Sequence, residues 1–436
     1  MISSQENINQ NNFDNKNKDK NNNLPKKFKQ FSYLSYEINK LLNLNTKKEN
    51  GIYFTPSNII QICLNEILEY SRNNNLIIKN ILEPCCGSCE FICAVDNFFN
   101  NTNIIGIENN DIIYNKIKDL KLNNNKLSLI NKNFFDSNLE KFDLVIGNPP
   151  FYIISKNNIS NKYHKFFDGR PNIFLLFIID SLKKLNDNGL LCFVLPVNFL
   201  NCIYYDKLRN FINCNYYIIN IINCETSNFI DTQQETIILI LQKTKYKFKN
   251  EKFSLPINNY CIFNDQNNIN FMKKLLNNSK SLYSLGFDVK VGNIVWNEKK
   301  NLLTDDSSKT ILIYNANIKN NKFEIQEFKN INKKNYINIK GKKDTVLLLN
   351  RGYGKGNYIF NYYIADLDQE YLIENHLIYI FHKKITDKNK LIEYFNIIIK
   401  SFQDERTKNF ISIYFGNNAI NTNELKHILP IYNFNL

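Results

Sequence analysis

The stretch FDLVIGNPPF, residues 142–151, sets a short apolar run directly before a Gly-Asn-Pro-Pro turn. The run from Asp143 to Ile146 is β-prone, which predicts a buried strand. Two consecutive prolines forbid both a helix and further strand pairing, so the strand must end at this turn. An asparagine fixed at a strand end, followed by an aromatic residue, suits holding a planar nitrogen heterocycle by its amino group. An Asn-Pro-Pro sequence also occurs in simple loops.

A strand–turn–helix unit lies upstream of this stretch. A predicted strand, Ile77 to Leu82, runs into a tight turn of small residues that contains Glu83 and Gly87. The next strand, Asn103 to Ile107, ends in Glu108, and in nucleotide-binding sheets an acid at this place accepts hydrogen bonds from ribose hydroxyls. Because Glu83 stands where a pyrophosphate would lie, a cofactor with an adenosine, a positive centre and no phosphate fits better. S-adenosylmethionine has these features; the alternative is an ordinary turn with a chance acid.

Strands and helices alternate from residue 31 to about residue 245. A third strand is predicted near residues 127–131, and a strongly apolar helix begins after Arg170, with Pro171 in its first turn. Further strands are predicted at residues 190–196, 216–222 and 235–241, of which the last two suit a hairpin. This alternation predicts an α/β fold with an open, mostly parallel, doubly wound sheet.

The sequence pattern is different in residues 246–436, where the predicted strands are short, turns are frequent and lysines are abundant. We expect a second domain of mixed α+β structure there. The glycine-rich stretch that carries Arg351 and Lys355 is either a hairpin loop or a contact to a phosphodiester backbone. Residues 1–30 form an Asn/Lys-rich segment of low complexity, for which a disordered tail is expected.

The 436 residues carry a formal net charge of +14, which favours a polyanionic partner such as nucleic acid. No apolar window reaches the length of a membrane span, and the N-terminus lacks the apolar core of a signal peptide, so a soluble intracellular protein is expected. The ten cysteines are expected to be free thiols. No metal is predicted, because the cysteines of the turn form only half of a zinc pattern and the four histidines are scattered. These cysteines are Cys85, Cys86, Cys89 and Cys93.

With these pieces in order, the chain resembles the amino-methyltransferases that act on adenine N6 in DNA, in the gamma-class group typified by the TaqI enzyme. The resemblance covers most of the chain and lies in the content and order of motifs. The matching stretches are Gly51-Ile-Tyr-Phe-Thr55-Pro56, Leu82-Glu83-Pro84-Cys85-Cys86-Gly87, Ile107-Glu108, Asn133-Phe134, Asn148-Pro149-Pro150-Phe151, Arg170-Pro171-Asn172 with Phe174 and Phe177, and Phe229 ahead of Gln234. The chain from residue 246 onward resembles the family's target-recognition domain more loosely. Cys89 stands where many members carry glycine, and Asn133 stands where aspartate is usual.

The resemblance implies an S-adenosylmethionine-dependent methyltransferase sheet and a role for each matching residue. The Asn148 side-chain oxygen and the Pro149 carbonyl would each accept one N–H of the adenine amino group and draw its nitrogen toward tetrahedral geometry. Phe151 would stack on the flipped base. The implied cofactor-binding residues are Thr55, Glu83, Cys85, Gly87, Glu108, Asn133, Phe134, Pro150 and Phe177. The implied DNA-binding residues are Phe229, Arg351 and Lys355.

The function expected from this resemblance is site-specific methylation of adenine N6 in double-stranded DNA, with S-adenosylmethionine as the cofactor. A restriction–modification system is one setting, in which a partner endonuclease would perform the cleavage; the chain itself is expected to be a monomer. The NPP-aromatic motif is shared with enzymes that methylate ribosomal RNA and release-factor glutamine, so an RNA N-methyltransferase is the main alternative. A non-catalytic nucleic-acid-binding protein that keeps the fold is another. The Thr55 segment, the Phe229 region and the basic second domain favour DNA.

Overall fold

The computed structural model describes Pro25, residues 28–224, Phe229, and residues 234–351, 359–414 and 420–434. The chain divides into two compact units, Met1–Leu255 with Cys261–Gln266 and Pro256–Tyr260 with Asn267–Leu436. Most of the segment predicted to be a disordered tail lies outside the described residues, as does Lys355.

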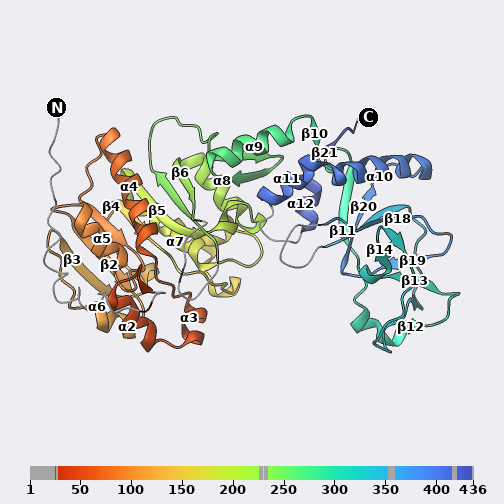
Figure 1. Cartoon of the computed structure of the whole chain (residues 1–436), viewed down its shortest axis with the longest axis horizontal. Helices are drawn as coiled ribbons and strands as arrows, with labels where there is room; N and C mark the ends of the chain where they lie inside the picture. The colour runs from red at the N-terminus through yellow and green to blue at the C-terminus, as the bar shows by residue number, and fades with distance from the viewer. Residues whose placement is uncertain are drawn as a thin grey trace. The chain divides into compact units, whose positions relative to one another are not determined.

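The first unit alternates strands with helices (Figure 1). Its helices are α2 (Tyr33–Leu41), α3 (Leu44–Asn50), α4 (Ser57–Asn73), α5 (Glu90–Phe98), α6 (Asp111–Ile117), α7 (Ile173–Lys183) and α8 (Asp206–Asn215). Its strands are β1 (Asn80–Glu83), β2 (Asn103–Glu108), β3 (Lys126–Asn131), β4 (Phe142–Gly147), β5 (Leu185–Pro196), β6 (Tyr217–Asn223) and β7 (Thr236–Gln242), followed by the hairpin β8 (Ser254–Ile257) and β9 (Tyr260–Phe263). Pro171 lies before α7 rather than in its first turn, because Asn172 is the N-cap and its side chain accepts from the Phe174 N–H.

Strands β1 to β7 form one sheet in the order β3-β2-β1-β4-β5-β7-β6. Strands β1 to β5 are parallel, and β7 runs antiparallel to both β5 and β6. The predicted doubly wound, mostly parallel sheet is therefore confirmed, with the expected hairpin at one edge. The strand order reverses between β1 and β4, and in open α/β sheets ligands bind outside the carboxyl ends of the strands at such a switch point.

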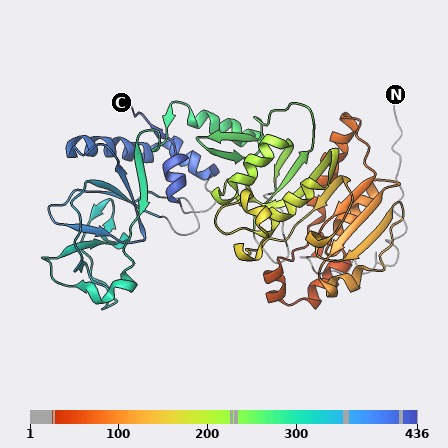
Figure 2. The same ribbon diagram turned by 180° about the vertical axis from the view of Figure 1, so that it is seen from behind.

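Both faces of the sheet are buried, as expected for parallel strands joined by helices. One face packs with α4, α5 and α6, while the other packs with α7 and α8. The reverse view in Figure 2 shows the second of these faces. Neighbouring residues of β4 divide between the two cores, with Val145 in one and Leu144 in the other. The two cores fix the directions of the strands and hence the place where their ends meet.

The first unit continues past residue 245, where the sequence analysis placed the domain boundary. The side chain of Arg209 on α8 is 1% exposed, and its Nε donates to the Cys261 carbonyl at 2.6 Å. The Cys261 N–H in turn donates to Asp206 at 2.7 Å. These buried contacts hold most of β9 to the first unit. At the other end Phe28, within the predicted tail, is 2% exposed and packs edge-on against Tyr36.

The second unit combines short strands with helices at its C-terminal end, which confirms the mixed α+β prediction. Its main sheets have the strand orders β11-β20-β17-β18 and β12-β16-β13-β19. The strands of these sheets are β11 (Phe287–Val291), β12 (Leu303–Thr304), β13 (Thr310–Ile313), β16 (Tyr336–Ile337), β17 (Val346–Asn350), β18 (Tyr362–Ala365), β19 (Tyr371–Ile373) and β20 (Leu377–His382). Short pairs are formed by β10 (Ser279–Lys280) with β21 (Ile431–Tyr432) and by β14 (Ile318–Lys319) with β15 (Lys322–Phe323). The helices are α9 (Gln266–Leu276), α10 (Lys388–Gln403), α11 (Glu405–Tyr414) and α12 (Thr422–His427).

Among the described residues, none of the helices combines the length and apolar character that crossing a membrane requires. In the same part of the chain, no group of three or more His, Cys, Asp or Glu side chains is arranged to hold a metal ion.

Candidate active site

The site is built where β1 and β4 end side by side. Ile81 pairs with Leu144 and Leu82 with Val145, so the next residues along the two strands, Glu83 and the Gly147-Asn148 turn, meet at one edge of the sheet. The backbone of Gly147 has φ +154°. A Cβ on Gly147 would lie 3.4 Å from Glu83 Cγ, which shows how closely the acid and the turn approach.

The amide of Asn148 is held in one orientation. Its Nδ2 donates to Thr55 Oγ1 at 3.1 Å and to the Tyr53 carbonyl at 3.4 Å. Its Oδ1 is buried, and among the described residues this oxygen has no hydrogen-bond partner. A buried acceptor without a donor costs free energy, so native proteins keep few of them and many serve function. The thiol of Cys85 donates to the backbone carbonyl of Asn148 at 3.4 Å, which fixes the turn from a second side.

Two flanking segments fix the residues after the prolines. Downstream, the Ile173 N–H donates to the Tyr152 carbonyl at 2.9 Å, and the Ile154 N–H donates to the Pro171 carbonyl at 3.0 Å. Upstream, Gly51 ends α3 with φ +61°, and a Cβ there would lie 2.6 Å from the Phe151 backbone nitrogen. Only glycine allows the upstream segment to come this close.

Substituting Gly51 with alanine is therefore expected to lower the free energy of unfolding by about 2–5 kcal/mol, because the left-handed backbone conformation costs roughly 1–2 kcal/mol and overpacking adds roughly 1–3 kcal/mol. Gly169→Ala is a matched control, since Gly169 has φ +62° but its Cβ would meet the ring of Tyr204, which is 53% exposed and can swing away. This control is expected to lose only about 1–2 kcal/mol. Urea denaturation of both variants measures the difference, and equal losses would contradict the close approach.

Glu108 ties two loops together at the end of β2. Its carboxylate accepts the Gly87 N–H at 2.9 Å and the Asn110 N–H at 2.7 Å. Burial raises the pKa of Glu108, and these backbone donors oppose that rise. Because both N–H groups come from loops around the cavity described below, Glu108 sets the shape of the predicted cofactor site as well as its charge.

Glu83 is a buried carboxyl group whose Oε2 has no partner among the described residues, and its side chain is 3% exposed. Burial raises the pKa of Glu83 well above its usual range, and the nearby Glu108 and Glu90 carboxylates raise it further, while a backbone hydrogen bond from Ile92 opposes the rise. Such a group is stabilised by a cation brought next to it.

Without such a cation, Glu83 makes stability depend on pH. Its raised pKa means that the folded chain holds the proton more tightly than the unfolded chain, so stability falls as pH rises above about 4.3, the unfolded pKa, and stays lowered above the folded pKa. Glu83→Gln is expected to lose part of this decline, which begins as pH rises above about 4.3. Urea denaturation of the ligand-free protein measures it, with Glu69→Gln, an exposed residue of α4, as the control. An unchanged pH dependence in Glu83→Gln would show that Glu83 is not the buried titrating group.

The predicted cofactor loop is tied to the N-terminal helix. Glu90 Oε1 accepts from both the backbone N–H and the hydroxyl of Ser32 at 2.9 Å, and from the Ser35 hydroxyl. Ser35 also shares a hydrogen bond of 2.6 Å with the Ser88 hydroxyl. Cys89 adopts φ +62° at the N-cap of α5, so it takes the left-handed backbone conformation that glycine adopts most easily. The departure from glycine therefore leaves the turn intact.

These elements enclose a cavity of about 660 Å³. It is lined by residues from the upstream segment, the ends of β1, β2 and β4, the loop after β3, and the start of α7. Seven predicted cofactor-binding residues line it: Cys85, Gly87, Glu108, Asn133, Phe134, Pro150 and Phe177. Asn148 also lines it. The Phe134 and Phe177 rings stack at 5.3 Å and form an apolar wall, while Asn133 caps the short helical turn that carries Phe134.

Other predicted site residues lie elsewhere. Thr55, Glu83 and Pro149 are buried behind the cavity wall. The half-buried ring of Phe151 packs edge-on against Phe174 at 6.0 Å instead of lining the cavity. Phe229 is 7% exposed in the core that contains α4 and α5. Arg351 belongs to the second unit, and Lys355 lies outside the described residues.

Several lining residues were not singled out from the sequence. They include Tyr53, Phe135, Tyr152 and Asn158. Tyr53 lies within a motif that was recognised, and Tyr152 directly follows Phe151 of another, so their positions were the signal available. The direction of the Tyr152 side chain depends on the pairing of residues 152–154 with residues 171–173, which the sequence does not reveal.

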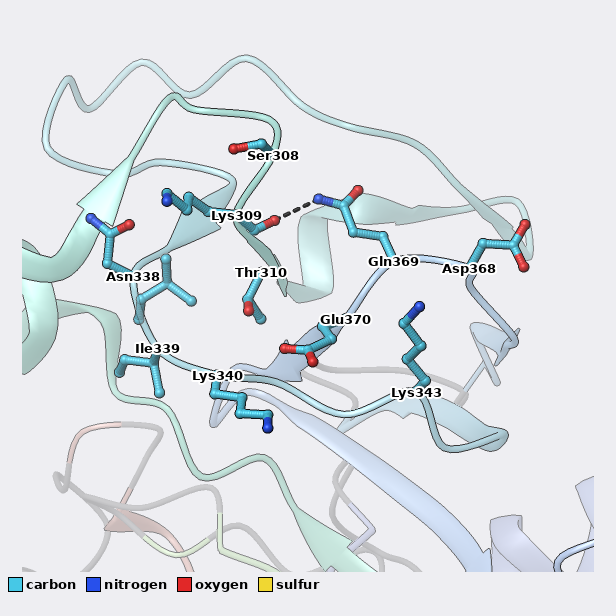
Figure 3. Close-up of a pocket in the computed structure, with 11 residues that line it drawn as sticks. Ser308, Lys309, Thr310, Asn338, Ile339, Lys340, Lys343, Asp368, Gln369 and Glu370 are labelled. Atoms are coloured by element: carbon cyan, nitrogen blue, oxygen red, sulfur yellow. Dashed lines mark hydrogen bonds between the residues drawn. The ribbon is translucent and has the colours of Figure 1, made fainter.

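The second unit contains a separate polar groove of about 870 Å³. Figure 3 shows Lys309 and Gln369 on one side of it and Lys340 and Lys343 on the other. The Gln369 amide donates to the Lys309 carbonyl at 2.5 Å, and the Glu370 carboxylate accepts the Gly341 N–H at 2.9 Å, so both sides are held in place. Lysine, amide and carboxylate groups together suit contact with a polar, charged polymer.

Residues 57–230 match the family model described as Eco57I restriction-modification methylase. The chain is 27% identical over 420 residues to the Type II methyltransferase M.CvrRI of Paramecium bursaria Chlorella virus XZ-6E, covering 93% of this chain and 100% of that protein. The comparisons support a DNA methyltransferase.

Two further relatives each match less than half of this chain. Modification methylase CviBIII of Paramecium bursaria Chlorella virus NC1A is 28% identical over 42% of this chain and 47% of its own length. The release factor glutamine methyltransferase of Clostridium botulinum is 30% identical over 35% of this chain and 57% of its own length. Residues 57–230, which match the family model, include the ends of β1, β2 and β4, and these ends line the cavity.

Proposed function

We propose that this DNA methyltransferase transfers a methyl group to N6 of adenine in a specific sequence of double-stranded DNA. The observation that carries the proposal is the buried, unpartnered Asn148 Oδ1 at the edge of the cavity. Both N–H groups of its amide already have acceptors, so only the carbonyl is available to a substrate amino group. Adenine, with its planar exocyclic NH₂, fits an acceptor of this kind.

The residues around the cavity fit S-adenosylmethionine, the cofactor that methyltransferase relatives imply. Glu108 would hold the ribose, the wall of Phe134 and Phe177 would contact the adenine, and the unpartnered Glu83 carboxyl would stabilise the positive charge. When bound, the cofactor supplies an electrophilic methyl group on a sulfonium sulfur, and this sulfur is the leaving group as a neutral thioether. No general base is needed before methyl transfer, because the amino nitrogen attacks while it still carries both protons; the methylated nitrogen would then release one proton to solvent.

The chain's own residues would then orient the acceptor nitrogen. Asn148 Oδ1 and the Pro149 carbonyl would each accept one N–H of the base, which draws the nitrogen lone pair out of conjugation with the ring. This is catalysis by positioning and fixed dipoles. The base must leave the duplex to reach the cavity, at a cost of a few kcal/mol. The predicted stacking on Phe151 and Phe229 is not part of this proposal, because Phe151 packs against Phe174 and Phe229 is buried in the core.

The direct test is transfer of labelled methyl groups from S-adenosylmethionine to unmethylated duplex DNA, to total RNA and to a release-factor substrate, in parallel. The proposal predicts incorporation into DNA alone. The release factor glutamine methyltransferase similarity makes a protein amide the second candidate, because the Asn148 carbonyl would bind the planar NH₂ of glutamine equally well. Labelled RNA or protein with unlabelled DNA would overturn the proposal.

In a restriction–modification setting, a partner endonuclease would perform the cleavage. We propose that this chain is a monomer.

The second unit is proposed to recognise the DNA, with Arg351 among its contacts and the lysines of the polar groove as further candidates. Each lysine that neutralises a phosphate steepens the fall of log K with log salt concentration by about 0.9, so Lys340→Ala with Lys343→Ala is expected to reduce that slope by up to about 2. Lys274→Ala with Lys400→Ala, two exposed residues of α9 and α10, removes the same charge elsewhere and should leave the slope nearly unchanged. DNA titrations at several salt concentrations measure both, and equal slopes for the two double variants would exclude the groove.

A further inference from the structure

The hydroxyl of Thr55 faces Asn148. Thr55 is 4% exposed and does not line the cavity, although all five residues just before it, 50–54, do. Its Oγ1 accepts one N–H of the Asn148 amide at 3.1 Å, and the Tyr53 carbonyl accepts the other at 3.4 Å. The two acceptors together use both donors of the side chain.

These two hydrogen bonds favour one orientation of the amide. A carbonyl oxygen cannot donate, so a rotated Asn148 would place its own Oδ1 against the Tyr53 carbonyl, and only the Thr55 hydroxyl could still form a hydrogen bond, by donating to that oxygen. With the nitrogen held on this side, Oδ1 is left on the other side with both lone pairs available. An unpaired, buried N–H would be the cost of losing either acceptor.

We propose that Thr55 is a positioning residue that aims the Asn148 carbonyl at the substrate amino group and does not bind the cofactor. This inference rests on the proposed methyl transfer and deepens it. It replaces the cofactor-binding role that the resemblance implied for Thr55. It also gives the upstream segment two tasks: residues 50–54 line the cavity, and the next residue orients the group that would meet the base.

Thr55→Val is the decisive variant, since it keeps the shape of the side chain and replaces only the hydroxyl, which is the acceptor for Asn148, by a methyl group. The single-turnover rate of methyl transfer to DNA at saturating S-adenosylmethionine is expected to fall by about 10–100-fold, the effect of one lost hydrogen bond and an amide free to rotate. The Kd for S-adenosylhomocysteine, from calorimetric titration, is expected to change by less than about 3-fold. Thr55→Ser restores the acceptor and is expected to recover most of the rate.

Two results would overturn the inference. A Thr55→Val variant with a normal rate at saturating cofactor but a Kd raised more than about 10-fold would make Thr55 a cofactor ligand. A variant like wild type in both measurements would leave Thr55 without a role at the site. If valine lowers the melting temperature by more than about 5 °C, Thr55→Ala removes the same acceptor and the same two results decide. A wild-type protein that labels no DNA refutes the proposed function and this inference together, whereas an active wild type with an unaffected variant refutes only the inference.

Discussion

Replacing Asn148 with alanine is expected to lower the rate constant of methyl transfer by about 10²–10³-fold, the usual effect of removing one preorganised polar group from a reacting centre. Binding of S-adenosylhomocysteine should stay within about 3-fold of wild type. The physical reason is that Oδ1 is the part of the side chain with no partner among the described residues, so its loss affects the substrate more than the fold. Single-turnover kinetics and calorimetry on the same preparation separate the two effects.

Asn213→Ala is the matched control for this experiment. Asn213 lies on α8 and also has a buried Oδ1 without a partner among the described residues, but it does not line the cavity. Its replacement should leave the rate unchanged. Near-normal transfer by Asn148→Ala, or an equal loss in Asn213→Ala, would remove Asn148 from the mechanism.

The second large effect is expected at Glu108. Glu108→Ala removes the acceptor of the Gly87 and Asn110 N–H groups as well as the proposed ribose contact. Hydrogen bonds to a charged group contribute roughly 1.5–3 kcal/mol, so the Kd for S-adenosylhomocysteine should rise about 10–100-fold. At saturating cofactor the transfer rate should fall much less, because Glu108 is proposed to contact only the cofactor.

Glu69→Ala, on an exposed position of α4, removes a glutamate without touching the cavity and should bind the cofactor normally. A Glu108→Ala variant with wild-type affinity would mean that the end of β2 does not form the cofactor site. An affinity loss of the same size in both variants would point to net charge rather than to the two backbone contacts.

The central sheet followed closely from local sequence. Apolar runs ended by Gly, Pro or acidic residues predicted β1, β2 and β4 to within a few residues, because such runs are too short for helices and too apolar for loops. The order of the strands then brought Glu83 and Asn148 together, since parallel strands end at the same edge of a sheet. The pairing of Glu108 with the Gly87 loop follows from the same topology.

Side-chain directions around the prolines could not be read in this way. Phe151 packs against Phe174 while Tyr152 lines the cavity, and this choice depends on how residues 152–154 pair with the segment before α7. The orientation of the Asn148 side chain depends partly on a hydrogen bond to the Tyr53 backbone carbonyl. Every residue has a backbone carbonyl, so this contact cannot be predicted from residue type. Likewise, the buried Arg209 that holds β9 to the first unit contacts carbonyl oxygens, which any residue could supply.

The most direct measurement is the identity of the modified nucleoside. Duplex DNA is incubated with the protein and S-adenosylmethionine, digested to nucleosides and separated by liquid chromatography with mass detection. If Asn148 Oδ1 and the Pro149 carbonyl hold the adenine amino group, the digest from the wild-type reaction should contain N6-methyladenine. The digest from the Asn148→Ala reaction should lack it. N4-methylcytosine or 5-methylcytosine in place of N6-methyladenine, or unmodified DNA from a protein that binds the cofactor, would contradict the proposed reaction.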